Sequence, residues 1–354
     1  MSTFGPENVV VRMLNAAQAA GATLGRAVSA MDAEVKGGVA SWVLAAALGL
    51  GLVQLFRVAV RVQTWVFGQL TPSRSPKAFG EWAVVTGCTD GIGLAMAEEL
   101  ARQGMNLVLV SRTQSKLADL AEVLEPKYRI RTKVLAINYA EATFADWARL
   151  EAALAGLSVG VLVNNCGMSY PRAMYTEETT DALVSDLIKV NCESLTNTTR
   201  VVLKAMLPRK KGCIVNVGSG AGMVYTEPCY SVYAGTKAYV DAFTRSLASE
   251  CRSRGIRVQC HIPLYVVSKM SKIRRSSLTV PSAKDYAKAA VAALGKDQGF
   301  SPTLAPVAIH GFMLAAANAV GFRLFEAMRL PQVLTLRRRG IQKLQRMELE
   351  GKSN

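Results

Sequence analysis

Short apolar runs alternate with longer helical stretches between Glu81 and about residue 290. The helical stretches include residues 93–103, 115–125, 179–207 and 230–253. The short runs are rich in apolar and β-branched residues: WAVVTG, NLVLVSR, KVLAIN, VGVLVNN, GCIVNVGSG and IRVQCHIP. Continuous rather than alternating apolar strands are typical of a sheet buried on both faces. The pattern therefore predicts an α/β domain with a doubly wound parallel sheet.

An uncharged stretch precedes this domain at residues 37–56, between Lys36 and Arg57. About twenty apolar residues span the hydrocarbon core of a bilayer, so the stretch predicts an N-terminal transmembrane helix, with a buried soluble helix as the alternative. Four basic residues and no acid follow before Glu81, whereas residues 1–36 carry three of each sign. Because positive flanks tend to stay in the cytosol, we expect residues 1–36 to be luminal and the domain to be cytosolic.

The α/β domain is predicted at residues 80–297, after an anchor and linker at residues 37–79. A second uncharged stretch follows the domain at residues 298–322. It is interrupted by Pro302, Pro306, Gly311 and Gly321. The stretch is long enough to span a membrane, but the prolines and glycines fit a re-entrant or surface-lying segment equally well. Residues 298–354 are thus predicted as a C-terminal apolar, membrane-associated segment with a basic tail.

The basic tail carries eight Lys or Arg against three Glu, a balance of +5. Such a cluster beside an apolar segment suits an anionic cytosolic leaflet, and a solvated tail is the alternative. The tail residues are Arg323, Arg329, Arg337, Arg338, Arg339, Lys343, Arg346 and Lys352, against Glu326, Glu348 and Glu350.

The whole chain is basic, with a formal charge of +16 over 354 residues. This charge fits an anionic partner, and the candidates are an acidic membrane, a phosphorylated small molecule and a nucleic acid. Nucleic acid is not expected as a partner, because the sequence has no zinc-finger, helix-turn-helix or RNA-binding signature. Seven scattered cysteines without a CxxC pair predict reduced thiols rather than disulfides or a zinc site. His261 and His310, each flanked by apolar residues, are expected to be core histidines, and no metal site is predicted.

Three glycines crowd the junction between the first strand and the helix after it: Gly87, Gly91 and Gly93. Glycines there allow a tight turn and let backbone N–H groups approach a pyrophosphate at the helix terminus, which is typical of a Rossmann-type fold. The next strand ends in Ser111 and Arg112, nineteen residues after Gly93. An arginine at this place pairs with a 2′-phosphate, so NADPH is favoured over NADH, with an arginine that merely caps the strand as the alternative.

The stretch SVYAGTK places Tyr233 and Lys237 four residues apart, on one helix face. A free phenol has a pKa of about 10, and nearby positive charge would lower it toward neutral pH. A phenol with a lowered pKa can act as a general acid, so Tyr233 is a candidate proton donor. For this pair alone, a structural tyrosine and lysine would be the simpler interpretation.

These motifs together resemble the short-chain dehydrogenase/reductase family over residues 80 to about 290. They follow in the family's order, and fourteen positions separate the serine from the tyrosine. The motifs are TGCTDGIG (86–93), NNCG (164–167), Asn191 in KVNCES, Ser219 in NVGSGAG, and Tyr233 with Lys237 in YAGTK. The sequence departs from the family at Asn138, which replaces an Asp near the adenine, at Leu264, which replaces a Gly, and at Ser268, which replaces a Thr.

The resemblance implies the roles of the site residues. The implied catalytic residues are Asn191, Ser219, Tyr233 and Lys237, with Asn191 holding a water of a proton relay. The implied cofactor contacts are Gly87, Thr89, Asp90, Gly91, Ile92, Gly93, Arg112, Asn138, Asn165, Gly167, Tyr233, Lys237 and Val266. Met168, Tyr170 and residues 264–280 are expected to border the substrate. The run KIRRSS within 264–280 fits either coenzyme A phosphates or a solvated loop.

Within the family the sequence is most similar to the membrane-bound 3-oxoacyl-CoA reductases of microsomal fatty acid elongation, relatives of 17β-hydroxysteroid dehydrogenase type 12. That similarity implies NADPH-dependent reduction of a long-chain 3-oxoacyl-CoA to the 3-hydroxyacyl-CoA at the endoplasmic reticulum membrane, beside other elongase enzymes. A steroid or retinoid oxidoreductase would use the same residues and is the alternative. A retired scaffold is the non-enzymatic alternative, although its expected mark, loss of Tyr233, Lys237 or the glycines, is not present. A homodimer is left open.

Overall fold

The computed structural model of the chain describes residues 18–19, 21–23, 25–27, 29, 42–56, 74–296 and 301–350. The chain divides into two compact units, residues 1–70 and 71–354. Most of the predicted luminal segment and most of the predicted linker lie outside the described residues.

In the first unit, the described part of the predicted transmembrane stretch is a helix, Trp42–Phe56. Its large apolar side chains are exposed, with Trp42 at 73%. Residues 37–41, where the predicted span begins, lie outside the described residues. Within the described ranges, no single helix is both long and apolar enough to cross a bilayer.

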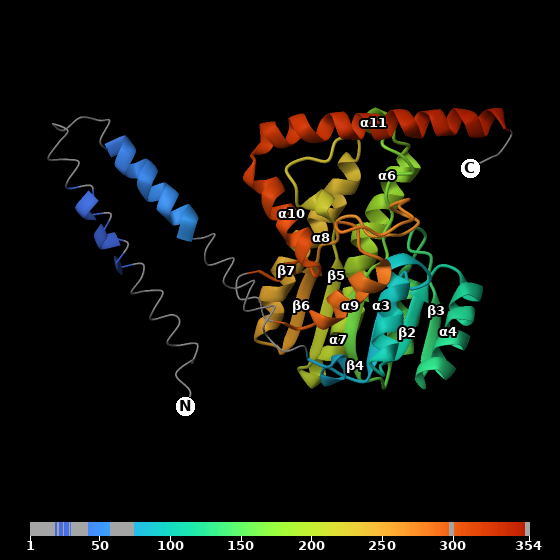
Figure 1. Cartoon of the computed structure of the whole chain (residues 1–354). Helices are drawn as coiled ribbons and strands as arrows, with labels where there is room; N and C mark the ends of the chain where they lie inside the picture. Colours follow the sequence, from blue (N-terminus) through green and yellow to red (C-terminus); the bar gives the residue numbers. More distant parts are fainter. Residues whose placement is uncertain are drawn as a thin grey trace. The chain divides into compact units, whose positions relative to one another are not determined.

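The second unit is built on a seven-stranded sheet in the order β3-β2-β1-β4-β5-β6-β7 (Figure 1). Its strands are β1 (Trp82–Thr86), β2 (Asn106–Ser111), β3 (Thr132–Ala136), β4 (Val159–Asn164), β5 (Gly212–Val217), β6 (Ile256–His261) and β7 (Thr303–Leu304). Every neighbouring pair is parallel, which confirms the predicted doubly wound parallel sheet. The strand order reverses between β1 and β4, and ligands of such sheets bind at the carboxyl ends of the strands near this point.

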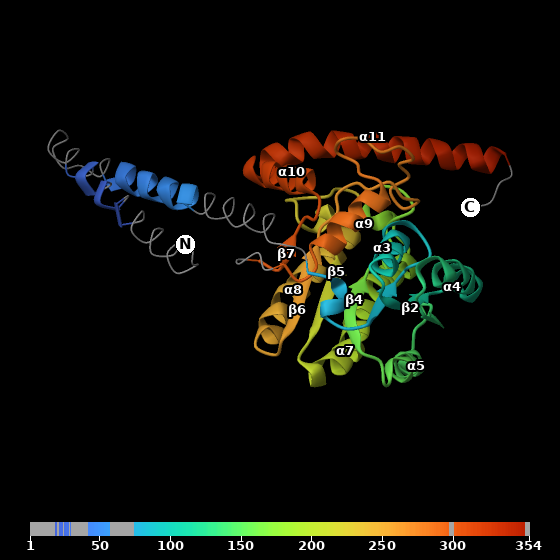
Figure 2. The same cartoon turned by 60° about the horizontal axis from the view of Figure 1, so that its bottom comes forward.

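Helices cover both faces of the sheet (Figures 1 and 2). Side chains of α3, α4 and α9 form one core with Ala83 and Val85, whereas those of α5, α7 and α8 form a second core with Val84 and Val108. Because adjacent strand residues point to opposite faces, both cores need apolar residues, and the strands become continuous apolar runs. The helices are α3 (Gly91–Arg102), α4 (Gln114–Tyr128), α5 (Phe144–Leu154), α6 (Asp181–Ile188), α7 (Ser194–Met206), α8 (Ser231–Arg252), α9 (Ala283–Ala292), α10 (Ala308–Ala319) and α11 (Phe322–Leu349).

Polar side chains fix where several helices begin. The hydroxyl of Thr180 accepts a hydrogen bond from Leu183 N at 3.2 Å at the start of α6. At the start of α9, the Ser282 hydroxyl accepts one from Asp285 N at 3.1 Å. Each bond satisfies a backbone donor that the first helical turn leaves without a partner, and such caps typically contribute about 1 kcal/mol.

The apolar stretch at residues 298–322 differs from its prediction at its beginning. Thr303 and Leu304 form β7 and pair with Cys260 and His261 of β6, so this part of the stretch is an edge strand of the sheet. Further along the stretch, Ala308–Ala319 forms α10, which is followed by α11 after a bend of 118°. Taken together, α10 and α11 are long and apolar enough to be a broken span or a re-entrant loop. Figures 1 and 2 show both helices at one end of the unit.

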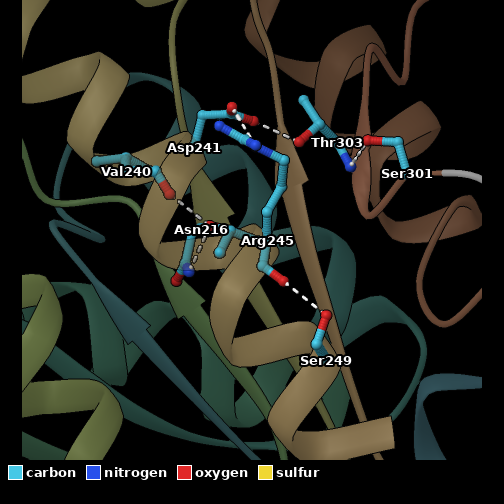
Figure 3. Close-up of polar contacts among 8 residues, drawn as sticks. Asn216, Val240, Asp241, Arg245, Ser249, Ser301 and Thr303 are labelled. Atoms are coloured by element: carbon cyan, nitrogen blue, oxygen red, sulfur yellow. Dashed lines mark hydrogen bonds and ion pairs between the residues drawn. The ribbon is translucent and has the colours of Figure 1, made fainter.

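Helix α8, which carries Tyr233 and Lys237, is tied to the sheet by buried polar contacts (Figure 3). Asn216 of β5 donates a hydrogen bond to the hydroxyl of Thr244 at 2.9 Å. Asp241 accepts one from the hydroxyl of Thr303 in β7 and pairs with Arg245 at 2.9 Å. These bonds fix α8 against β5 and β7. They thereby also fix the orientation of its first turns, which carry Tyr233 and Lys237.

Both histidines are buried, as predicted, but their surroundings differ. His310 accepts a hydrogen bond from Leu264 N at 3.3 Å through Nδ1, and its Nε2 lies 3.3 Å from Thr279 O. His261, in contrast, has no hydrogen-bond partner on either ring nitrogen. Burial lowers the pKa of His261 to about 3.

We expect the buried His261 to make the protein less stable in mild acid. Its pKa is about 3 in the folded state and about 6.5 in the unfolded state, so the unfolded chain takes up the proton first as the pH falls. The free energy of unfolding should therefore decrease below pH 6.5, by about 2 kcal/mol at pH 5 from this residue. Urea unfolding of the full-length protein at pH 7 and pH 5 measures this loss.

His261→Phe is the matched variant for this prediction. It keeps a ring in the core but cannot be protonated, so its loss of stability between the two pH values should be smaller by about 2 kcal/mol. An equal loss in wild type and variant would mean that His261 is accessible to protons in the folded state.

Candidate active site

The glycine-rich loop lies between β1 and α3, next to the end of β4. Gly87 and Gly91 have φ angles of 62° and 55°, which glycine adopts without strain. The Asn165 side chain donates hydrogen bonds to Thr86 O and Gly87 O at 3.2 Å each. At the start of α3, the Asp90 carboxylate accepts a bond from Gly91 N at 2.8 Å. The loop is thus held by β4 on one side and capped at the helix on the other.

The glycine loop fits a dinucleotide phosphate, because its backbone packs too closely for side chains. A Cβ on Gly93 would overlap Gly87 O and the amide nitrogen of Asn165. A Cβ on Gly87 would lie 3.0 Å from the Cα of Cys166, at a backbone angle that L-residues rarely adopt. The backbone therefore approaches the helix terminus closely, which is the arrangement that binds a pyrophosphate in such folds.

The predicted adenine-side residues follow β2 and β3. Ser111 at the end of β2 shares a hydrogen bond of 3.0 Å with Thr89 of the glycine loop, and Arg112 beside it is exposed. Asn138 is exposed after β3, where its side chain accepts a bond from Ala140 N at 3.4 Å. Arg112 is therefore free to reach a ligand at this edge, while Asn138 is engaged in its own turn.

Two further predicted cofactor contacts are partly or fully buried. Ile92 packs against the core on the α3 side, and Val266 is 3% exposed in that same core. The segment that carries Val266 also reaches the glycine loop, because a Cβ on Gly91 would lie 3.5 Å from the Cβ of Ser268. Lys269 and Asp90 form an exposed ion pair at 3.0 Å across this contact. The loop after β6 therefore lies against the glycine-rich loop.

Tyr233 has its ring in an apolar cluster and its hydroxyl beside Ser219. The ring packs with Tyr170, Met174 and Leu187. Burial raises the pKa of the phenol, a hydrogen bond with Ser219 lowers it, and the neighbouring Glu227 and Tyr265 raise it. In the protein alone the Tyr233 phenol is therefore a weak acid. To donate a proton at neutral pH, it needs a positive charge close to its hydroxyl during the reaction.

Lys237 is buried one turn along the same helix. Its Nζ donates a hydrogen bond to Val217 O at 3.0 Å and would lie 3.4 Å from a Cβ on Gly167. Burial lowers the pKa of this ammonium, and the thiols of Cys260, Cys166 and Cys192 raise it. The NNCG segment and the lysine thus meet at the carboxyl end of the sheet.

Asn191 lies in a π-helical turn, Lys189–Glu193, between α6 and α7. Its side chain donates to Met168 O and to the hydroxyl of Thr236, both at 3.0 Å, and accepts from Met168 N at 2.8 Å. Single π-helical turns are frequent at functional sites. Both N–H groups of the Asn191 side chain donate within the protein. A water at Asn191, as predicted, could therefore bind only to Oδ1, which can accept a second hydrogen bond, or to the backbone.

Of the segments predicted to border the substrate, Met168 and Tyr170 pack in the same cluster as Tyr233. Met168 binds Asn191, and the Tyr170 hydroxyl accepts a bond from Val232 N at 3.2 Å. His310 of α10 fastens the loop after β6 at Leu264 and Thr279. In the run KIRRSS, Lys272 donates to Pro171 O at 2.6 Å, whereas the arginines at 274 and 275 are exposed. This exposure fits both interpretations of the run, contact with coenzyme A phosphates and a solvated loop.

The basic tail differs from its prediction, because two of its arginines pair with the domain. Arg329 binds Glu227, with Nε 3.1 Å from Oε2, and Arg337 binds Glu178. Val333 between them is fully buried. These contacts hold α11 over segments that follow β4 and β5. No sequence pattern marks Arg329 or Glu227, since an arginine in a charge-rich tail resembles its solvated neighbours.

Residues 81–278 match the family described as short chain dehydrogenase, more than half of the chain. The chain belongs to this family of oxidoreductases. The resemblance stated from the motifs is thereby confirmed, and so is the sheet topology that it implies.

Curated relatives extend the likeness beyond the family domain. The chain is 40% identical over 271 residues to a zebrafish (Danio rerio) protein named very-long-chain 3-oxoacyl-CoA reductase-B, which covers 76% of this chain and 86% of the relative. It is also 40% identical over 309 residues to a very-long-chain 3-oxoacyl-CoA reductase-like protein of Arabidopsis thaliana, covering 85% of this chain and 96% of the relative. The second match includes residues outside the family domain.

Among solved structures, a short-chain dehydrogenase from Sphingobium yanoikuyae in complex with NADPH is 28% identical to this chain. The likeness has a TM-score of 0.56 and covers 67% of this chain and 92% of the other. The part of this chain that holds the glycine-rich loop and Tyr233 therefore has the same fold as a protein that binds a nicotinamide dinucleotide.

Proposed function

We propose that this protein reduces the 3-keto group of a long-chain 3-oxoacyl-CoA to a 3-hydroxy group with NADPH. The observation that carries the proposal is the hydrogen bond between Tyr233 and Ser219, with the buried Lys237 one turn further along the same helix. The substrate class is supported by the relatives named 3-oxoacyl-CoA reductase, which are 40% identical.

The chemistry divides between cofactor and protein. NADPH, when bound, supplies the hydride and leaves a positive charge on its nicotinamide ring. Tyr233 donates a proton to the oxygen of the reduced ketone, and Ser219 hydrogen-bonds that oxygen as its negative charge develops. Lys237 contributes a cation to the same buried region, and Asn191 orders the NNCG segment through Met168. The proton relay from Lys237 through a water at Asn191 stays a prediction.

The cofactor residues are proposed from the loops that meet at the switch point of the sheet. The glycine loop with Thr89, Asp90 and Ile92 would hold the pyrophosphate side. Asn165, Gly167 and Val266 border the nicotinamide side in this proposal, and Asn138 lies nearest the adenine side.

Arg112 is proposed to select NADPH over NADH. Its exposed guanidinium follows β2, where a 2′-phosphate on the adenine ribose is recognised in such folds. Arg112→Ala should raise the KM for NADPH by roughly tenfold to a hundredfold and leave the KM for NADH nearly unchanged. Steady-state kinetics with both cofactors measure the effect, and Arg131→Ala serves as a control because that arginine stacks on Trp82. Equal losses with both cofactors would contradict the role.

Membrane attachment at the endoplasmic reticulum, with the domain in the cytosol, is part of the proposal. The apolar helix Trp42–Phe56 supports an anchor. Because Arg329 and Arg337 pair with the domain, α11 is proposed to lie on the leaflet rather than cross it. Its exposed residues include apolar side chains and cations, which are Leu324, Met328, Leu330, Leu336, Arg338, Arg339, Lys343 and Arg346. Association with other elongase enzymes, or of two copies, remains a prediction.

The proposal is tested by the substrate that the full-length protein prefers. The purified protein in detergent is given NADPH with 3-oxoacyl-CoA substrates of graded chain length and, separately, with estrone. Oxidation of NADPH with the long acyl substrates, at a kcat/KM well above that for estrone, is the expected result. A preference for estrone would move the assignment to a steroid oxidoreductase, and no turnover of either would count against a reductase.

A further inference from the structure

A cavity of about 420 Å³ lies at the end of the sheet opposite to the candidate active site. Its lining comes from the segments that precede β1 and β5 and from the turn into β6, and the amino ends of parallel strands share one edge of a sheet. The candidate active site is built at the carboxyl ends, the end that α11 also covers (Figure 1). Strands of five or six residues span about 16 to 20 Å, so the cavity is separate from the site around Tyr233.

The lining of this cavity is basic. Four of its described residues are cations, and none of the described ones is acidic: Arg74, Lys211, Arg252 and Arg257. Arg74 precedes β1, Lys211 directly precedes β5, and the other two arginines flank the turn between α8 and β6. Among the residues that the structure describes, Arg74, Lys211 and Arg252 form no ion pair. Like charges around one cavity repel, so an anion that binds among them is stabilised.

A fifth cation, Arg209, connects two sides of the lining from behind. Its guanidinium donates hydrogen bonds to the backbone carbonyls of Phe79 and Lys211, which both line the cavity, and to that of Val159 in β4. Its Nε is buried without a hydrogen-bond partner. Within the described part of the chain, no carboxylate pairs with Arg209. Arg209 therefore adds positive charge that the described side chains do not neutralise.

The two turns that carry Lys211 and Arg252 are packed backbone to backbone. Gly255, in the turn between α8 and β6, has a φ angle of 78°, which glycine adopts without strain. A Cβ on Gly255 would lie 2.1 Å from the backbone oxygen of Lys210, so the two turns approach as closely as a glycine allows. This contact keeps the attachment points of both cationic side chains at the cavity.

We propose that this cavity is a second binding site, which takes a phosphate-bearing anion, with a diphosphate as the best match. A phosphate group carries more charge and more acceptor oxygens than a carboxylate, and arginine forks and lysine ammonium groups bind such groups well. The volume lies in the range of small-molecule sites, roughly 300–1,000 Å³, so it has room for two phosphate groups. Because Arg74 follows the predicted anchor linker, a bound anion would tie the start of the domain to β5 and β6. The group can belong to a soluble molecule or to the headgroup of an acidic phospholipid.

The test measures the binding of inorganic pyrophosphate to the full-length protein in a nonionic detergent by isothermal titration calorimetry. NADPH is present at saturation, so that the proposed cofactor site is occupied. We expect one bound pyrophosphate per chain. Lys211→Gln combined with Arg252→Gln should raise the Kd of pyrophosphate by roughly tenfold or more, because two charge-assisted contacts are lost.

Lys210→Gln combined with Arg254→Gln is the matched control. It removes the same charge from the same two turns, but these two residues do not line the cavity. The Kd should rise by less than about threefold, since salt screens charges that do not contact the anion. All four side chains are exposed, so neither double variant should disturb folding, and an unchanged Kd for NADPH checks this.

A second probe separates the two sources of the phosphate group. Dihexanoyl phosphatidic acid is titrated below its micelle concentration, with dihexanoyl phosphatidylcholine as its control. Binding of the phosphatidic acid that is tighter than that of pyrophosphate, and that is weakened by Lys211→Gln with Arg252→Gln, would support the site with a lipid headgroup as its ligand. Tighter binding of pyrophosphate would support it with a soluble diphosphate.

Two results would overturn the proposal: no binding of either probe, or equal weakening in the two double variants. Gly93→Ala, in the glycine-rich loop, should leave the Kd of pyrophosphate unchanged. A loss in Gly93→Ala without a loss in Lys211→Gln with Arg252→Gln would place the anion at the glycine-rich loop and would also overturn it. Because no turnover is measured, the outcome does not depend on whether the protein reduces a 3-oxoacyl-CoA.

Discussion

Tyr233→Phe is expected to lower kcat for ketone reduction on the order of a thousandfold while leaving the Kd of NADPH nearly unchanged. The substitution removes only the hydroxyl that donates the proton, and general acid catalysis typically contributes a factor of this size. The ring stays in its cluster with Tyr170, Met174 and Leu187, so folding should not be affected. Turnover of a long 3-oxoacyl-CoA and fluorescence titration with NADPH measure the two quantities.

Tyr230→Phe is the matched control for this prediction. Tyr230 packs against Tyr170 in the same cluster, with 5.4 Å between ring centroids and the rings tilted by 37°, but the proposed chemistry does not use its hydroxyl. The control should keep activity within a few-fold of wild type. Full activity in Tyr233→Phe would mean that another group donates the proton, and equal losses in both variants would point to packing instead.

Gly93→Ala is expected to weaken NADPH binding by roughly tenfold to a hundredfold. The new methyl group would overlap Gly87 O and the Asn165 side chain, which hold the glycine-rich loop closed against β4. Relieving such overpacking typically costs 1–3 kcal/mol, and about 1.4 kcal/mol corresponds to a tenfold change in Kd. Isothermal titration calorimetry of NADPH against the full-length protein measures the loss.

Gly311→Ala in α10 is the comparison for the glycine prediction. A Cβ there would meet Ala305 at 3.7 Å, an ordinary contact, and alanine favours a helix by up to about 1 kcal/mol over glycine. NADPH binding should not change in this variant. Unchanged binding in Gly93→Ala as well would show that the glycine-rich loop does not contact the dinucleotide.

The sheet was predictable because its signal is local. Strands β1, β2 and β4 are mostly apolar and almost wholly buried, because they fill two cores, and this requirement shows in the sequence itself. Strand β7 was not predictable, because two residues inside an apolar stretch carry no strand pattern, and their pairing with β6 depends on tertiary contacts. Helices α5 and α9 are short, and their polar caps at Thr143 and Ser282 were the available signals.

The site was predictable where chemistry forces a spacing. The four-residue interval between Tyr233 and Lys237 and the glycines after β1 are visible in the sequence, and the structure places them at the same end of the sheet. The sequence predicted a lowered pKa for Tyr233, whereas burial raises that pKa in the protein alone, and the burial of one ring cannot be read from a local motif. The pairing of Arg329 with Glu227 joins residues 102 positions apart, and nothing in a charge-rich tail marks one arginine for it.

Transfer of deuterium tests the central claim most directly. The full-length protein is incubated with a long-chain 3-oxoacyl-CoA and with NADPH that carries deuterium at both C4 positions, and the product is analysed by mass spectrometry. A 3-hydroxyacyl-CoA with one deuterium at C3, formed by the wild type and not by Tyr233→Phe, is the predicted result. An unlabelled product, or no 3-hydroxyacyl-CoA from a folded protein that binds NADPH, would contradict it.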